Sequence, residues 1–221
     1  MDSFSSSQGE VIMAALVKTI QENAAYLSEV DGAIGDGDHG INMSKGFTRA
    51  GQLTVTGPID LSTGLNRLGD VLMTEIGGAM GPLYGTLFME MAGACKGKAA
   101  IDEQVWKQML TAGLAGVKDL GGAQVGDKTL LDTLSPATEA FAAAVDRGAS
   151  FHEALRQMVD AAEKGKESTR GLVARLGRAS RLGERSRGVL DAGATSCYLI
   201  LKSMADSADT LLGQHDQSPA A

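Results

Sequence analysis

Three aspartates near the N-terminus, Asp31, Asp36 and Asp38, lie within eight residues of one another, beside glycines. Asp36 and Asp38 alternate around Gly37, so a turn can point both carboxylates to the same side. Magnesium prefers oxygen ligands and is usually held by one or two carboxylates together with phosphates, and three aspartates could hold two ions. The spacing therefore predicts a magnesium site.

Two other interpretations of this cluster are a calcium site and a solvated acidic turn. The EF-hand loop pattern, D-x-[DN]-x-[DN]-G with a closing glutamate, is absent from the chain. Calcium is therefore disfavoured, whereas the acidic turn stays open as long as the cluster is considered alone.

Glycines gather in four segments, 35–40, 77–85, 121–129 and 177–194, with helical patterns between them. In an up-and-down helix bundle every second connection lies at the same end, so these four loops are expected to meet at one rim. Glycine loops let backbone N–H groups approach a phosphate closely, and a helix N-terminus that follows adds positive potential. The loops could be tight turns only, but four such loops that together carry charged and hydroxyl residues favour phosphate binding.

Two of these segments imitate better-known phosphate motifs. Residues 35–40 match G-x-G-x-x-G, but the positions that would face a pyrophosphate hold Asp36 and Asp38, and no strand pattern precedes them. Residues 121–129 resemble a P-loop, yet Asp127 interrupts the G-K-[ST] ending. We therefore expect a cation between the aspartates and the phosphates rather than either motif.

A basic, glycine-rich segment at 177–188 carries Arg178 and Arg185. Guanidinium groups match phosphate oxygens in pairs and also stack on purines. The segment is therefore a candidate nucleotide contact. The alternative is a surface charge run in which Glu184 and Asp191 pair with the arginines.

The segments between the loops have a helical period. Aromatic residues make up only 4% of the 221 residues, and strand-like alternation is scarce. Ser150 followed by Glu153 predicts a capping box at one helix start. We expect a single domain over 1–221, with a core at about 10–205, seven or eight helices, and a loose tail after Leu212. The clearest helical periods lie in residues 10–28, 61–76, 101–117 and 194–212.

Composition disfavours several classes of protein. The net charge is −7 and no Lys/Arg-rich run occurs, which is atypical of nucleic-acid binders and of proteins on anionic membranes. The chain has neither an apolar stretch of membrane-spanning length nor a recognisable secretory signal. Cys95 and Cys197 are expected to be buried thiols in a cytoplasmic protein, since two cysteines make no disulfide framework.

The chain resembles the L subunit of dihydroxyacetone kinase, a unit that also forms the C-terminal domain of single-chain dihydroxyacetone kinases. The resemblance runs from about residue 10 to about residue 205. Its motifs stand in the family's order: Asp31 with GDGDHG, Asn42, GGAMGPLYGT (77–86), GDKTLLDTL (126–134) and GRASRLGERSRGVLDAGATS (177–196).

This resemblance implies an all-α fold, an eight-helix antiparallel up-and-down barrel with the nucleotide site at one end. It implies two Mg²⁺ ions that bridge the phosphates of ADP or ATP to Asp31, Asp36 and Asp38. The nucleotide contacts that it implies are His39, Gly40, Ile41, Asn42, Ala79, Met80, Gly121, Leu130, Arg178, Asp191, Ala192 and Gly193.

The resemblance also implies a phosphotransferase of the glycerone kinase type that is active only with a partner. In this family a separate K subunit or domain holds the ketose covalently through a histidine. The phosphoryl donor stays open between exchangeable ATP and a phosphohistidine protein of the phosphotransferase system that recharges bound ADP. A nucleotide-sensing module that binds a transcription regulator is the alternative function, although the intact aspartate triad favours catalysis.

Two positions depart from the family pattern. Arg181 stands where the family usually has tyrosine, and Ala192 replaces a proline. Proline fixes φ and lacks an N–H, so alanine leaves this loop freer and adds a donor. A related short ketose, such as a tetrulose, therefore stays open as the acceptor.

Overall fold

Helices dominate the chain. The structure, a computed structural model, describes residues 2–53 and 59–215. Within these residues lie the α-helices α1 (Gly9–Glu22), α2 (Ala24–Gly32), α3 (His39–Leu53), α4 (Leu61–Glu75), α5 (Met80–Cys95), α6 (Glu103–Gly121), α7 (Leu131–Asp146), α8 (Phe151–Ser168) and α9 (Ala192–His215). The 3-10 segments are η1 (Ser6–Gln8), η2 (Thr169–Gly171) and η3 (Arg178–Ser186), and the strands are β1 (Ser3–Ser5) and β2 (Ala100–Asp102).

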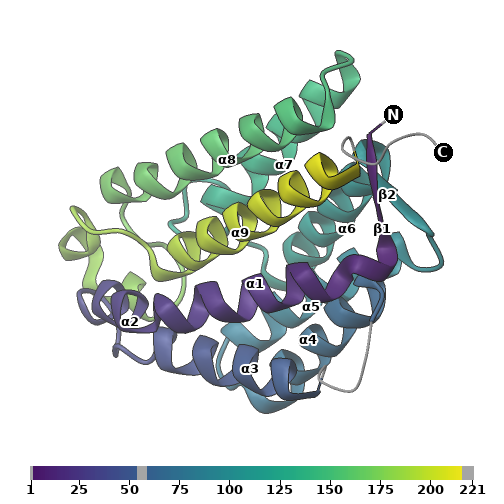
Figure 1. The fold of residues 1–221 in the computed structure, drawn as a ribbon. Coiled ribbons are helices and arrows are strands. Elements are labelled where there is room, and N and C mark those ends of the chain that lie inside the picture. The colour runs from purple at the N-terminus through teal and green to yellow at the C-terminus, as the bar shows by residue number, and fades with distance from the viewer. Residues whose placement is uncertain (1, 54–58, 216–221) are drawn as a thin grey trace, which may run out of the picture.

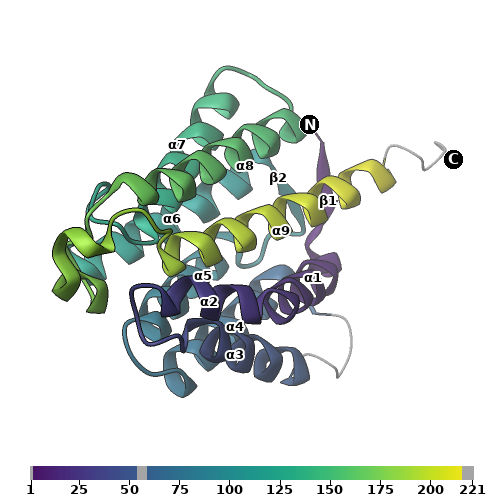
Figure 2. The same cartoon turned by 90° about the vertical axis from the view of Figure 1, so that its left-hand side faces the viewer.

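In the part of the chain that the structure describes, eight helices form a closed ring (Figures 1 and 2). Each helix from α3 to α8 packs against the next one in the sequence, α9 packs back on α1, and α1 packs on α3. Neighbouring helices of the ring run in opposite directions, so the ring is an antiparallel up-and-down barrel. The short α2 extends α1 and packs on α3. The expected all-α, eight-helix architecture is confirmed.

The predicted helical faces are the faces that pack into the core. The apolar residues of α4 recur every three or four positions, and one side of the helix is almost completely excluded from solvent. The same holds for α6, whose inward side packs against α5. The apolar side chains that the two helices bury are Leu61, Leu65, Leu68, Val71, Leu72, Val105, Trp106, Met109, Leu110, Leu114 and Val117.

The helix expected over residues 10–28 is interrupted at Asn23, which separates α1 from α2. The carbonyl oxygen of Thr19 accepts both the backbone N–H of Asn23, at 3.2 Å, and its side-chain amide, at 2.8 Å. An asparagine amide that bonds the preceding turn in this way competes with the regular helix ladder. The break redirects the chain and brings the end of α2 to the rim of the barrel (Figure 1).

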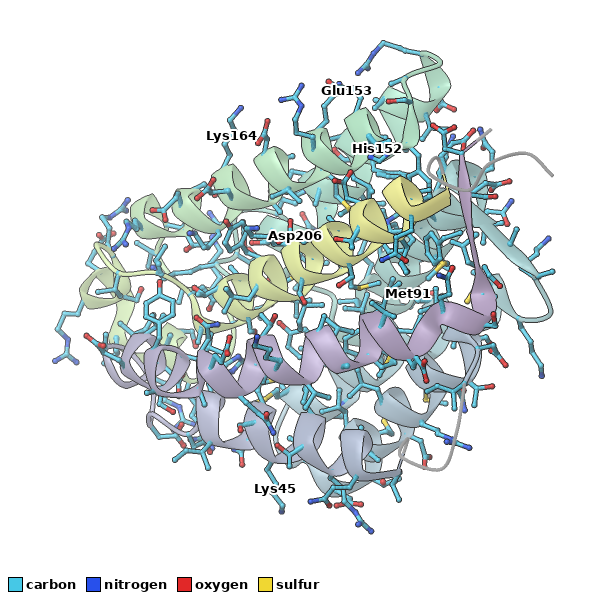
Figure 3. All side chains as sticks on the ribbon, in the orientation of Figure 1. Lys45, Met91, His152, Glu153, Lys164 and Asp206 are labelled. Carbon is cyan, nitrogen blue, oxygen red and sulfur yellow. The ribbon has the colours of Figure 1, made fainter. Side chains whose placement is uncertain are left out.

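The start of α8 corrects one expectation. The hydroxyl of Ser150 accepts the backbone N–H of Glu153 at 3.2 Å, as predicted. The carboxylate of Glu153, however, accepts from Arg156 at 2.6 Å and from Gln157 at 2.7 Å rather than returning to the cap. Only half of the capping box forms, because side chains one turn further along the helix compete for the carboxylate. Figure 3 shows Glu153 and Lys164 on the outer side of α8.

A short antiparallel sheet closes the barrel at the end far from α2 (Figure 1). Strands β1 and β2 pair with Phe4 opposite Ile101, a feature that the sequence did not predict. Phe4 is 1% exposed, and its ring lies 6.2 Å from Trp106 and 6.5 Å from Phe151, centroid to centroid. The sheet therefore anchors the N-terminal segment through one aromatic side chain.

Among the described residues, no helix is both long and apolar enough to cross a bilayer. Helix α9 continues to His215. The tail expected after Leu212 falls mainly on residues 216–221, which lie outside the described residues.

Replacing Phe4 with alanine should reduce the free energy of unfolding by about 3–5 kcal/mol, because a fully buried aromatic side chain is lost from a packed cluster. Urea denaturation followed by circular dichroism measures this change. Tyr26→Ala removes an aromatic side chain that is 41% exposed and serves as the matched control. Equal effects of the two substitutions would show that burial of Phe4 adds no more to the free energy of unfolding than an exposed aromatic side chain does.

Candidate functional site

Four connections meet at one end of the barrel and enclose a cavity of about 840 Å³. They are the α2–α3, α4–α5, α6–α7 and α8–α9 loops, which are the four glycine-rich segments, and their meeting at one rim is confirmed. The volume suits a ligand of nucleotide size. The first half of the lining is Asp31, Ile34, Gly35, Asp36, Asp38, His39, Asn42, Gly77, Gly78, Ala79, Met80, Pro82, Leu83 and Tyr84. The remainder is Val117, Leu120, Gly121, Ala123, Lys128, Thr129, Leu130, Leu131, Leu176, Gly177, Arg178, Ala179, Asp191, Ala192 and Gly193.

Asp31, Asp36 and Asp38 converge at the mouth of this cavity. One carboxylate oxygen from each lies within 4.8 Å of those of the other two. Asp31 is half-buried at the end of α2, whereas Asp36 and Asp38 are exposed in the loop that follows. Three anionic oxygens at this spacing are a donor set that fits a hard divalent cation such as Mg²⁺.

Two glycines make this convergence possible. A Cβ atom on Gly35 would lie 2.4 Å from a carboxylate oxygen of Asp31 and 2.9 Å from its carbonyl oxygen. Gly37 has a φ of +77°, in the left-handed region that favours glycine. The backbone carbonyl of Asp31 accepts the N–H of Gly35 at 2.5 Å and that of Ile34 at 3.1 Å, which closes the turn.

The N-terminus of α3 faces the cluster. The carboxylate of Asp31 accepts the backbone N–H of His39 at 3.4 Å, and the carbonyl of Asp38 accepts that of Asn42 at 2.9 Å. The positive end of the helix dipole therefore lies beside the aspartates and offsets part of their mutual repulsion.

Behind the cluster, His39 joins a buried hydrogen-bond network. Its Nε2 lies 2.8 Å from the hydroxyl of Ser196, which in turn lies 2.6 Å from the hydroxyl of Tyr84. The Tyr84 hydroxyl donates to the carbonyl of Gly193 at 2.9 Å. Burial lowers the pKa of His39 to about 4, although the charge of Asp31 opposes this shift. A neutral imidazole thus links α3, α5 and α9 in the cavity wall.

Two further carboxylates organise the back of the cavity. Asp132 accepts the backbone N–H groups of Gly126 at 2.6 Å and of Thr129 at 2.7 Å, which shapes the α6–α7 loop. Asp191 accepts the N–H of Ala194 at 2.7 Å and so caps the start of α9. Burial raises the pKa of Asp191 to about 7, and the charges of neighbouring aspartates act in the same direction.

The basic segment reaches the aspartates directly. Arg178, at the start of η3, forms an ion pair with Asp36. Glu184 pairs with Arg187 at 3.0 Å, and Asp191 caps a helix rather than pairing with an arginine. A plain surface charge run therefore does not describe this loop, because one of its arginines contacts a candidate metal ligand.

Most of the predicted site residues line the cavity, but Gly40 and Ile41 do not. A Cβ atom on Gly40 would lie 1.9 Å from the carbonyl oxygen of Ala24, so this glycine allows α3 to approach α2 closely. The side chain of Ile41 is 65% exposed. Along α3, successive residues point in different directions, so His39 and Asn42 face the cavity while the two residues between them do not.

Five polar residues of the site were not predicted: Tyr84, Lys128, Thr129, Asp132 and Ser196. Each stands inside a motif that carries the family resemblance, yet their types alone indicate no role. Lys128 is 2% exposed, which is unusual for a lysine.

Comparison with known proteins identifies relatives of this chain. The family model described as the DAK2 domain matches residues 33–206. The ADP-binding subunit DhaL of PEP-dependent dihydroxyacetone kinase 2 from Listeria innocua is 39% identical over 186 residues, covering 82% of this chain and 85% of that protein. The ADP-binding subunit DhaL of the PEP-dependent dihydroxyacetone kinase from Escherichia coli is 38% identical over 181 residues, covering 81% and 86%.

Solved structures share the fold. The native form of the dihydroxyacetone kinase of C. freundii superposes with a TM-score of 0.69 at 25% identity, covering 90% of this chain and 34% of that one. The structure of the C. freundii kinase in complex with AMP-PNP and Mg²⁺ gives a TM-score of 0.68 at 24% identity, covering 94% and 35%. The chain thus corresponds to about a third of that kinase.

Replacing Gly35 with alanine should weaken Mg²⁺ binding measured in the presence of ADP by about tenfold or more, because the added methyl group displaces Asp31. Isothermal titration calorimetry measures the affinity. Gly93→Ala is the control, since a Cβ atom there meets nothing within 4 Å. Unchanged affinity in Gly35→Ala would show that the position of Asp31 is unimportant.

Proposed function

Because this chain belongs to the DAK2 domain family, we propose that it is the ADP-binding, phosphoryl-donor subunit of a dihydroxyacetone-type kinase, folded as a single domain. The observation that carries this proposal is the convergence of Asp31, Asp36 and Asp38 at the mouth of a cavity lined by four glycine-rich loops. The relatives at 38–39% identity, which are named as ADP-binding subunits, support the same function.

Asp31, Asp36 and Asp38 are the proposed ligands of Mg²⁺, with two ions as the proposed number. When bound there, the metal would neutralise phosphate charge at the transferring group. The chain's own part is to hold three carboxylates at fixed spacing. It does so through the turn at Asp31 and the start of α3.

The nucleotide is proposed to lie in the cavity behind the aspartates. Arg178 is placed to reach phosphate oxygens, since its guanidinium already contacts Asp36. The N-terminus of α5, which has no side-chain cap, opens into the same space, and such a helix end attracts anions. The residues proposed to contact the nucleotide are His39, Asn42, Ala79, Met80, Gly121, Leu130, Arg178, Asp191, Ala192 and Gly193. Gly40 is proposed to contribute by packing α3 against α2.

The acceptor is proposed to be dihydroxyacetone, or a related short ketose, held by a separate K subunit. The donor phosphate would lie at the rim, so the acceptor must be presented in line by a second surface. We propose ADP as the resident nucleotide, recharged by a phosphohistidine protein. This choice is supported by the names of the relatives, which are called PEP-dependent and ADP-binding. Release of the bound nucleotide from purified protein, followed by its identification, tests it.

Substitution of a single aspartate should abolish most of the Mg²⁺-dependent part of ADP binding. Asp38→Asn and Asp36→Asn should each weaken MgADP binding by about tenfold or more while leaving metal-free ADP binding much less affected. Calorimetry with and without EDTA measures the two affinities.

The two variants separate loss of the metal contact from loss of the ion pair with Arg178. Asp36 also pairs with Arg178, so Asp36→Asn changes two interactions, whereas Asp38→Asn tests the metal contact alone. The control is Asp70→Asn on the exposed side of α4. Equal MgADP affinity in wild type and Asp38→Asn would rule out the metal assignment.

The isolated chain should have no appreciable kinase activity on dihydroxyacetone. Activity should appear on adding the K subunit of a relative together with ATP or a phosphohistidine donor. Without the second surface the encounter is unoriented, and an effective molarity on the order of 10⁵ M is lost. A coupled steady-state assay decides the matter, and robust turnover by the pure chain would contradict the two-part scheme.

A further inference from the structure

Lys128 has a backbone conformation that residues other than glycine rarely adopt. Its φ is +64°, and every other described residue with a positive φ is a glycine. The left-handed region costs conformational free energy for a residue with a Cβ atom, so something must compensate. The side chain is also buried, with 2% of its surface exposed.

The compensation comes from the ammonium group, which lies within hydrogen-bond distance of four backbone carbonyls. The Nζ atom lies 2.7 Å from Thr169 O and 3.3 Å from Leu172 O at one end of the loop that joins α8 to α9. It lies 2.7 Å from Ser186 O and 2.6 Å from Val189 O at the other end. Residues 169–189 are called the clamped loop below. A single cation thus ties both of its ends together.

The backbone on both sides of Lys128 is itself held in place. Asp132 accepts the N–H groups of Gly126 and Thr129, on either side of the lysine. Asp127 adds a second link, because its carbonyl accepts the N–H of Arg175 at 3.1 Å. The α6–α7 loop and the clamped loop are therefore joined as one unit.

The surroundings of the Lys128 amine favour its protonated, cationic form. An ammonium has three N–H donors, and four carbonyl oxygens surround it. Burial lowers the pKa of Lys128, whereas the charges of Asp191 and Asp132 oppose that shift. The carbonyl cage and the two carboxylates compensate for the cost of burying the charge.

The clamped loop, whose two ends Lys128 ties together, carries Arg178. Gly177 and Arg178 line the cavity, and Arg178 pairs with Asp36 on the far side of the mouth. The side chain of Arg178 is 61% exposed, so packing contributes little to its placement. Its position depends instead on the backbone from which it projects.

We propose that Lys128 is a positioning residue that acts through Arg178, by locking the clamped loop so that the guanidinium stays at the phosphate end of the cavity. This inference rests on the proposed function. It assigns Lys128 no contact with the phosphates, in contrast to the lysine of a P-loop.

The test measures MgADP affinity by calorimetry, well below the Tm of each variant. Lys128→Met should weaken binding by about tenfold or more, as does loss of a group that orients a ligand contact. Lys166→Met is the matched control, because Lys166 is 8% exposed on α8 and contacts Glu167 and the ring of Tyr198. It should lower the Tm yet leave the affinity unchanged.

A double-mutant cycle separates positioning from a general loss of stability. In an Arg178→Ala background, Lys128→Met should cost no further affinity, since the positioned group is already gone. An equal loss in both backgrounds would overturn the proposal, as would unchanged affinity in folded Lys128→Met. Failure of the wild-type chain to bind MgADP would overturn the proposed function as well.

A second variant and a second measurement cover the case in which Lys128→Met does not fold. Lys128→Gly removes the amine and also relieves the backbone strain, because glycine accepts a φ of +64°. Hydrogen exchange on the wild type should show amides of residues 173–185 and 126–131 opening as one unit. Independent opening of residues 173–185 while 126–131 stay protected would overturn the proposal.

Discussion

Repulsion among three carboxylates is the constraint on which this end of the molecule depends. Their oxygens lie within 4.8 Å of one another, a spacing that is unfavourable unless positive charge is close by. The chain supplies such charge from the N-terminus of α3 and from the guanidinium of Arg178. Elements from opposite sides of the rim are therefore held in register, and a divalent cation fits the same electrostatic demand.

The barrel provides the rigid frame that holds these groups. A closed ring of antiparallel helices places alternate loops at the same end, and the small sheet around Phe4 closes the other end. The site itself is built from loops, which need internal ties to be precise. Asp132, Lys128 and the network of His39, Ser196 and Tyr84 provide these ties through backbone and side-chain hydrogen bonds.

The two departures from the family pattern differ in their structural consequences. Ala192 is the first residue of α9, the position at which proline is best tolerated because its N–H has no intrahelical partner. Alanine there keeps the helix start and adds only a free donor. Arg181 lies exposed within η3, so its extra charge points to solvent at the rim rather than into the cavity lining.

Much of this protein was determined by the sequence alone. Helical periods predicted the helical architecture, the alternation of glycine segments with helices predicted one rim, and the spacing of Asp31, Asp36 and Asp38 predicted that their carboxylates converge. These features depend on neighbours within a few residues, where spacing controls geometry. The tertiary structure decided the rest: the break at Asn23, the packing of Gly40 against α2, the exposure of Ile41, the sheet formed by residues 3–5 and 100–102, and the burial of Lys128. Lys128 meets carbonyls 41 to 61 residues further along the chain, and no local pattern specifies contacts between segments that only packing brings together.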